Sequence, residues 1–116
     1  MPIMIPAKDK RRADSKAANA AAGALQRTRR IQRAAALLKQ ASDPTRLQVI
    51  SMLSRGERHV GSMCEELTQN QPALGHHLAL LRHGGIITPR RRGKNQFYHL
   101  TGAGVRLSQV VKRVFG

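Results

Sequence analysis

The stretch that most constrains the fold is residues 70–100, where a short amphipathic helix precedes a basic hairpin. Asn70 followed by Pro72 predicts a helix start, because a capping side chain is followed by proline in the first turn. The helix is expected over residues 71–83, before Gly84. The residues spaced to form its buried side are Leu74, Leu78 and Leu81. The opposite side is small and polar, which suits close approach to another molecule.

Two strands are predicted after this helix, over residues 86–91 and 96–100, with a turn at residues 92–95. The cations around the turn are Arg90, Arg91, Arg92 and Lys94. No acidic residue stands beside them in the sequence, so this concentration of like charge is favourable only near a polyanion. We therefore predict contacts with phosphate or the minor groove, the alternative being an ordinary solvated charge run.

The chain as a whole is strongly basic. Its 116 residues include 21 Lys and Arg against 6 Asp and Glu, a formal charge of +15. Such a balance indicates a polyanionic partner, DNA or RNA first and an anionic membrane surface second. No apolar run approaches the roughly 20 residues that span a bilayer. We expect a soluble cytoplasmic protein, although the Lys-, Arg- and Ala-rich start also leaves an organellar transit peptide open.

The N-terminal part divides into a tail and the start of a domain. Residues 1–16 contain a basic cluster and too few apolar side chains to fold alone, so we expect a disordered tail. That tail either adds solubility only or follows the DNA backbone. The domain is expected over residues 17–116 and begins with a helix that ends near Gln40. The apolar stripe of that helix is Ile31, Ala34, Ala35 and Leu38.

Three further helices complete the domain. Asp43 before Pro44 predicts a helix over residues 44–55, and Ser62 is the expected cap of a helix over residues 62–68, after a short extended stub at residues 59–60. The last helix is expected over residues 101–115. Like the first helix, this helix has a stripe of apolar residues along one side. Nothing else in the sequence covers these two stripes fully, so we expect each to meet its copy in a twofold dimer. The predicted dimer contacts are Ile31, Leu38, Leu107, Val110, Val111 and Val114.

Three segments in this order resemble the ArsR/SmtB family of dimeric winged-helix transcriptional repressors. They are residues 38–47 (LKQASDPTRL), 71–82 (QPALGHHLALLR) and 91–100 (RRGKNQFYHL), and the resemblance covers roughly residues 34–114. It implies a mainly α fold with a small β-hairpin (α+β), a winged helix-turn-helix of about five helices with a two-stranded wing. Dimerisation through the first and last helices is also implied, in agreement with the pattern.

The candidate DNA-binding residues lie on the helix at residues 71–83 and on the hairpin. In a major groove, Gln can bind adenine bidentately, and His or Arg can reach guanine or phosphate. The predicted set is Asn70, Gln71, Ala73, Gly75, His76, Arg82, Arg90, Arg91, Arg92 and Lys94. Gly75 departs from the family pattern, which commonly has Ser there, so one contact is lost. His77 falls beside the buried leucines and is expected to be structural.

The metal-binding motifs of the resembled family are absent. Its Cys-x-Cys motif corresponds here to residues 59–61, which contain no cysteine, and residues 101–116 contain no His, Asp, Glu or Cys. We therefore expect no metal and no other cofactor. The single cysteine, Cys64, cannot form an internal disulfide. It is a candidate redox residue, although the neighbouring Glu65 and Glu66 disfavour a thiolate.

The sequence thus predicts a homodimeric repressor that binds double-stranded DNA sequence-specifically. An enzyme is not expected, because no nucleophile with a base, carboxylate pair or phosphate-binding loop is recognisable. One alternative is a nonspecific or architectural DNA/RNA-binding protein that uses the same basic surface. Another is a protein-interaction module whose winged helix has lost DNA binding, as suggested by Gly75. The inducer is not identified by the sequence.

Overall fold

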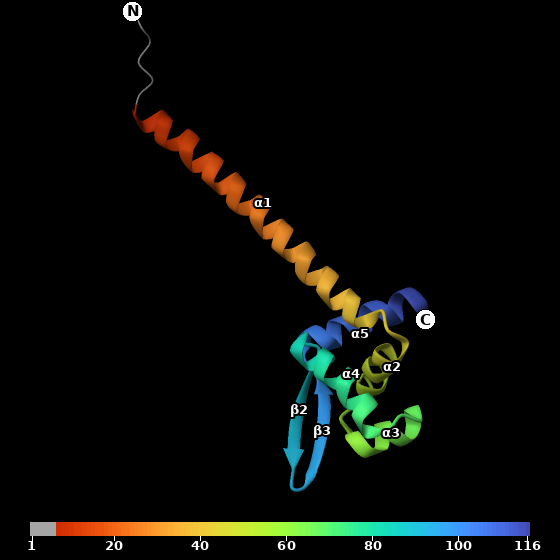
Figure 1. Ribbon diagram of the computed structural model, residues 1–116. Coiled ribbons are helices and arrows are strands. Elements are labelled where there is room, and N and C mark those ends of the chain that lie inside the picture. The colour runs from red at the N-terminus through yellow and green to blue at the C-terminus, as the bar shows by residue number, and fades with distance from the viewer. Residues whose placement is uncertain (1–6) are drawn as a thin grey trace, which may run out of the picture. The chain divides into compact units, whose positions relative to one another are not determined.

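Residues 7–116 form five helices and a small antiparallel sheet (Figure 1). The computed structural model describes the backbone of residues 7–116 and the side chains of residues 11–116. The elements in order are α1 (Ala7–Ala41), α2 (Pro44–Leu53), β1 (Arg58–His59), α3 (Val60–Leu67), α4 (Gln71–His83), β2 (Ile87–Arg92), β3 (Asn95–Leu100) and α5 (Gly102–Phe115). The mainly α fold with a hairpin is confirmed. The chain divides into two units after Ala35.

The first unit consists of most of α1. This helix begins at Ala7 rather than at the predicted Ala17, so the disordered tail expected over residues 1–16 does not hold for residues 7–16. Residues 1–6 lie outside the described part of the chain. The helix extends this far because alanine, arginine and lysine are strong helix formers and no proline occurs between Pro6 and Ala41. Among residues 7–116, no helix has the length and apolarity to cross a membrane.

The second unit, residues 36–116, contains the hydrophobic core. Its largest fully buried side chains are Val49, Ile50, Met63, Leu74, Leu81, Ile86 and Ile87. They come from α2, α3, α4 and the start of the hairpin, and α5 adds the buried Leu107. Gly104 of α5 lies against the backbone of Ile86, and a Cβ at Gly104 would be 2.2 Å from the Ile86 carbonyl oxygen. Only glycine allows α5 to approach the hairpin so closely.

Short polar contacts fix the ends of the helices in this unit. Asp43 caps α2 as predicted, although α2 ends at Leu53, two residues before the predicted Arg55. The cap of α3 differs from the prediction. The side chain of His59, not that of Ser62, accepts the Gly61 N–H at 3.1 Å, so α3 begins two residues earlier than expected. A histidine ring nitrogen can replace the usual hydroxyl or carboxylate oxygen as a cap, which residue type alone does not reveal.

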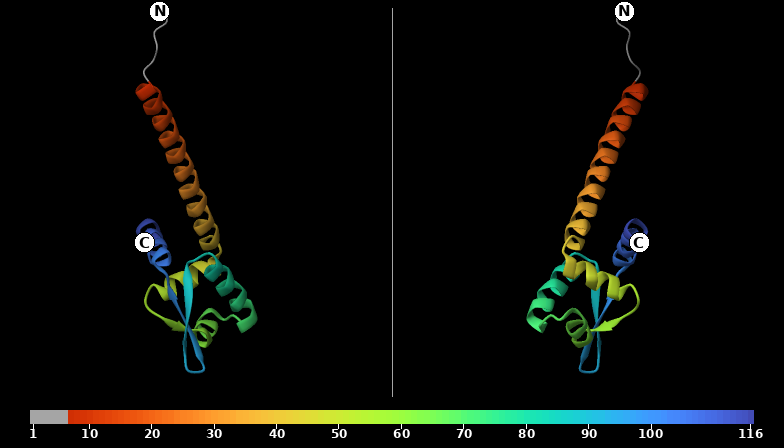
Figure 2. Two further views of the ribbon diagram at one scale, coloured as in Figure 1. Left: turned by 90° about the vertical axis from the view of Figure 1, so that its left-hand side faces the viewer. Right: turned by 90° about the vertical axis from the view of Figure 1, so that its right-hand side faces the viewer.

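The sheet contains one strand more than the predicted two-stranded wing. Its order is β1-β3-β2, and all pairs are antiparallel. The extended stub expected at residues 59–60 is β1, which begins and ends one residue earlier. It pairs with β3, and the partners are Arg58 with Tyr98 and His59 with Phe97. The turn between β2 and β3 uses Gly93 at a φ of +61°. Figure 2 shows the β2–β3 hairpin, which we call the wing, projecting beyond the helices of the second unit.

Candidate nucleic-acid interface

Helix α4 is anchored along one side and open along the other. The Asn70 side chain accepts the Ala73 N–H at 2.8 Å, as expected for the cap. Leu74 and Leu81 are fully buried and Leu78 is 2% exposed. The helix packs against α2, α3 and β2. The predicted start, extent and buried side of α4 are confirmed, so its outward direction is fixed by the core.

The predicted contact residues of α4 lie on the open side. Those that are exposed are Asn70, Gln71, Gly75, His76 and Arg82, whereas Ala73 is half-buried. No atom lies within 4 Å of the place where a Cβ on Gly75 would be. This side therefore offers amide, imidazole and guanidinium groups around Gly75, where no side chain obstructs the approach of another molecule.

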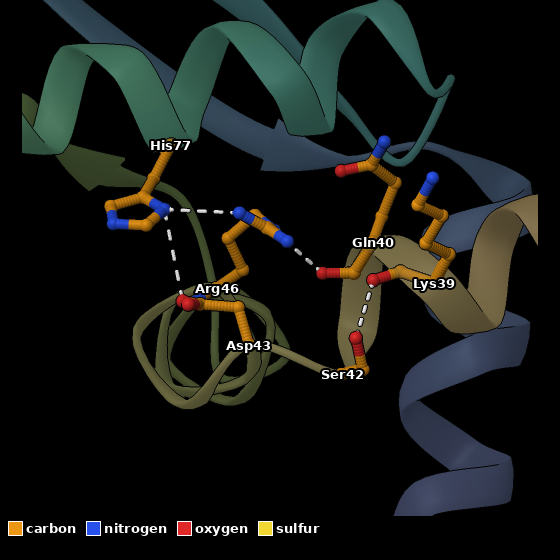
Figure 3. Close-up of polar contacts among 6 residues, drawn as sticks. All are labelled: Lys39, Gln40, Ser42, Asp43, Arg46 and His77. Atoms are coloured by element: carbon orange, nitrogen blue, oxygen red, sulfur yellow. Dashed lines mark hydrogen bonds and ion pairs between the residues drawn. The ribbon is translucent and has the colours of Figure 1, made fainter.

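His77 ties α4 to the junction of α1 and α2 (Figure 3). Its Nδ1 lies 3.3 Å from Nη1 of Arg46 and 3.7 Å from Oδ2 of Asp43. The Nε of Arg46 donates to the carbonyl oxygen of Gln40, in the last turn of α1, at 2.7 Å. Arg46 thus bridges three helices, and the position of His77 in this network fits the structural role predicted for it. Arg46 was not among the predicted residues, although it is the only charged residue of α2.

The carboxylate of Asp43 supplies the negative charge of this network. It accepts the Arg46 N–H at 3.0 Å, and that hydrogen bond is the main cause that lowers the pKa of Asp43 below its usual value. The neighbouring His77 and the Arg46 guanidinium lower the pKa further. Asp43 therefore stays ionised well below neutral pH. In this form its carboxylate caps α2 beside Arg46 and His77.

The four cations of the wing differ in their surroundings. Arg90, Arg91 and Lys94 are exposed. Arg92 is exposed too, but its Nη2 lies 2.8 Å from Oε2 of Glu57, and its guanidinium lies 5.4 Å from the centre of the Phe97 ring. The wing thus has an acid beside it in space, although none stands beside its cations in the sequence. Glu57 is distant in sequence and reaches Arg92 because β1 pairs with β3, which the sequence analysis did not predict.

The predicted dimer residues divide between the core and the surface. Leu107 is 7% exposed and belongs to the core of its own chain, and Val111 packs against that core. Exposed fractions are 54% for Val110 and 65% for Val114. The exposed residues of α1 in this set are Ile31 and Leu38. Leu107 therefore holds α5 on its own chain, and the spacing of the stripe did not distinguish this contact from a contact with a second copy.

Cys64 and the histidines do not form a cluster. Cys64 is half-buried and packs against the core. Among the residues whose side chains are described, no three His, Cys, Asp or Glu are grouped in a way that would hold a metal ion.

Comparison with known proteins identifies relatives of this fold and sequence. A family model described as "Bacterial regulatory protein, arsR family" matches residues 43–88. An uncharacterised HTH-type transcriptional regulator of Methanocaldococcus jannaschii is 34% identical over an alignment of 88 residues, which covers 72% of this chain and 92% of that protein. A biofilm growth-associated repressor of Xylella fastidiosa is 37% identical over 87 residues, 75% of each chain.

Solved structures agree with these sequence matches. Reduced HlyU from Vibrio cholerae superposes with a TM-score of 0.72 at 30% identity, covering 78% of this chain and 96% of that one. A homodimeric winged helix-turn-helix DNA-binding domain from Mycobacterium bovis superposes with a TM-score of 0.69 at 29% identity. This match covers 77% of this chain and 83% of that one. The identity and the shared fold together show that the chain belongs to the ArsR family of winged-helix transcriptional regulators and is not an enzyme.

Proposed function

We propose that the chain is a cytoplasmic homodimeric repressor that binds double-stranded DNA sequence-specifically. Each subunit presents α4 to a major-groove half-site and the wing to the adjacent backbone or minor groove. The observation that carries the proposal is the division of α4 into two sides. Its leucines are locked into the core, while Gln71, His76 and Arg82 are exposed on a helix of fixed direction. Base edges are read by such a helix, and phosphates by exposed cations like those of the wing.

Competition binding tests sequence specificity. The probe is a duplex from the upstream region of the chain's own gene, and the competitor is random duplex of the same length at physiological salt. A specific reader binds its site roughly 10³-fold or more tightly than random DNA. Equal affinity for the two duplexes would contradict the repressor and favour the nonspecific or architectural protein. That second candidate is supported by the exposed cations, whose phosphate contacts carry no sequence information.

The wing offers a matched pair of variants. Arg91 is exposed, whereas Arg92 is held by Glu57 and Phe97. We expect Arg91→Ala to weaken binding to all duplexes and to reduce the slope of log affinity against log salt by about 1. Arg92→Ala should have a smaller effect on the salt slope and should loosen the wing instead. Unchanged binding in Arg91→Ala would favour a protein-interaction module that does not contact DNA through its wing.

The dimer is proposed to involve α5. Val110 and Val114 lie one turn apart on the side of α5 that the chain's own core leaves exposed. A pair of exposed valines on a helix is a surface that a second copy can cover. We expect a double variant with Val110→Asp and Val114→Asp to be monomeric. Its mass, measured by light scattering, should fall from that of a dimer to that of a monomer. The exposed Val105 gives the control, since Val105→Asp alters the same helix at a position outside the proposed contact.

A further inference from the structure

We propose that residues 11–33 of α1 form a second phosphate-binding surface, which holds duplex nucleic acid through its backbone in addition to the contacts of the winged-helix unit. This proposal builds on the proposed function, but its test does not depend on sequence-specific reading. The surface lies within the first unit and is made by one helix alone.

The charge of this segment is one-sided. Residues 11–33 contain a single acid, Asp14, and seven cations. The cations are Arg11, Arg12, Lys16, Arg27, Arg29, Arg30 and Arg33. All seven are exposed. A segment with six net positive charges by this count (seven less one) raises the local concentration of any polyanion and gains free energy when counterions are released from phosphates.

Helical geometry places these cations on about half of the surface. At about 100° per residue, Arg11 and Arg29 project in the same direction, five turns apart, and so do Arg12 and Arg30. Arg33 falls between these two directions, and Lys16 and Arg27 fall about 40° and about 60° beyond the second. The segment from residue 11 to residue 33 rises roughly 33 Å, which is close to the 34–36 Å of one turn of B-DNA. The cations form two clusters on this side, at residues 11–16 and 27–33, separated by the uncharged residues 17–26. A helix with two such clusters can contact the phosphates of a duplex at two places along its length.

The spacing of the cations is unfavourable for an isolated helix. Arg12 and Lys16 are four residues apart, and so are Arg29 and Arg33. Like charges at this spacing destabilise a helix by about 0.2–0.5 kcal/mol per pair. Asp14 is the only acid that can offset them within residues 11–33. Phosphates beside this surface would replace repulsion with attraction, which is the physical reason to expect a polyanionic partner.

The remaining half of the helix favours nucleic acid over a membrane. An amphipathic helix that binds a membrane surface buries tryptophan, phenylalanine or leucine side chains on its apolar face. Within residues 11–33 the large apolar residues are Leu25 and Ile31, and the rest of the side opposite the cations consists mainly of alanine. Alanine supplies little apolar area to insert between lipids. The segment has the charge for an anionic surface, but Leu25 and Ile31 are its only two large apolar side chains, fewer than a membrane-binding helix needs.

The test compares two variants of the full-length chain with equal net charge. The first carries Arg29→Gln, Arg30→Gln and Arg33→Gln in α1. The control carries Arg55→Gln, Arg106→Gln and Arg113→Gln, three exposed arginines of the second unit. Glutamine retains good helix propensity, so circular dichroism should show the same helicity in both. Affinity for a random duplex of about 50 base pairs, a length chosen to exceed one turn, is measured between about 50 and 200 mM salt.

We expect the α1 variant to lose up to about 2.7 from the slope of log affinity against log salt, about 0.9 for each phosphate contact removed. Over the fourfold change in salt this is a difference of roughly 40-fold, whereas the control should lose clearly less. An unchanged slope in the α1 variant, or an equal loss in the control, would overturn the proposal. So would loss of binding to phosphatidylglycerol vesicles with an unchanged duplex slope, because the surface would then serve a membrane.

The two proposals can fail separately. Preference for the chain's own upstream duplex over random duplex reports on the winged-helix unit, and the α1 variant should retain it. Absence of this preference in the unaltered chain would remove the specific repressor, while a reduced slope on random duplex in the α1 variant would still support the phosphate-binding surface.

Discussion

Helix α4 and the first unit's part of α1 are both helical, but different forces hold them. In α4 the leucines at Leu74 and Leu81 are fully buried, and Asn70 and His77 fix its start and its side by polar contacts. In α1, residues 11–35 are exposed throughout, apart from the half-buried Gly23. Packing therefore gives α4 one orientation, whereas propensity gives α1 a helical backbone without selecting which side contacts a partner.

This difference suggests a division of work. Reading bases requires side chains held in fixed positions, which packing can provide for α4. Holding phosphates requires only charge in roughly the right direction, which α1 provides without a core. The two helices should therefore respond differently to the same kind of change.

The largest contrast should come from removing one leucine from each helix. Leu74→Ala removes a fully buried side chain from α4 and should lower the free energy of unfolding by about 2–5 kcal/mol. Leu25→Ala, at a position in α1 that is 50% exposed, should change it by less than about 0.5 kcal/mol. Urea denaturation followed by circular dichroism measures both. Comparable losses in the two variants would mean that α1 is packed as tightly as α4.

A second contrast exchanges glycine for alanine. In Gly104→Ala the new Cβ would lie 2.2 Å from the Ile86 carbonyl oxygen, so α5 must shift, at a cost of about 1–3 kcal/mol. In Gly23→Ala the nearest atom is the Arg27 side chain at 3.5 Å, an ordinary contact, and the exchange should increase helicity. The thermal midpoint should fall for Gly104→Ala and rise or stay constant for Gly23→Ala. A rise for Gly104→Ala would show that the close approach of α5 is not needed.

Gly75 allows a smaller and more functional test. A Cβ there meets nothing within 4 Å, so Gly75→Ala should stabilise α4 by about 1 kcal/mol. Gly75→Ser should gain less stability and restore a hydroxyl on the open side of α4. If that side faces DNA, serine should alter the ratio of affinities for the upstream and random duplexes, whereas Gly23→Ser in α1 should leave this ratio unchanged. The same ratio in all variants would argue against contact at Gly75.

The smallest expected effect is the acid response of Asp43. Its pKa is lower in the folded chain than in the unfolded one, so its stabilisation is fully present above the unfolded value of about 3.9 and is lost as pH falls through the lower folded pKa. Acid titration, followed by the fluorescence of the buried Tyr98, should therefore unfold the second unit. In Asp43→Asn the stability of this unit should depend less strongly on pH over the same range. The same dependence in Asp43→Asn would assign acid sensitivity to other groups.

Much of α4 was predictable because its signals are local. The cap at Asn70, the proline at residue 72 and the leucines that share one side act within one or two turns, and all were confirmed. The three-strand sheet was not predictable, because β1 has only two residues and forms through pairing with β3, about 40 positions later. The contact of Arg92 with Glu57 follows from that pairing and was missed for the same reason. The start of α1 was misplaced because charge was weighed above the helix propensity of alanine and arginine.

By itself, the sequence determined the order of the five helices and the hairpin, the buried side of α4 and the strong positive charge. These depend on residue type and on spacing along one element. Only the tertiary structure decided that Leu107 serves the core, that Arg46 joins α1, α2 and α4, and that Arg92 is held by an acid. Such contacts join residues far apart along the chain, and their geometry exists only after the core has brought the elements together.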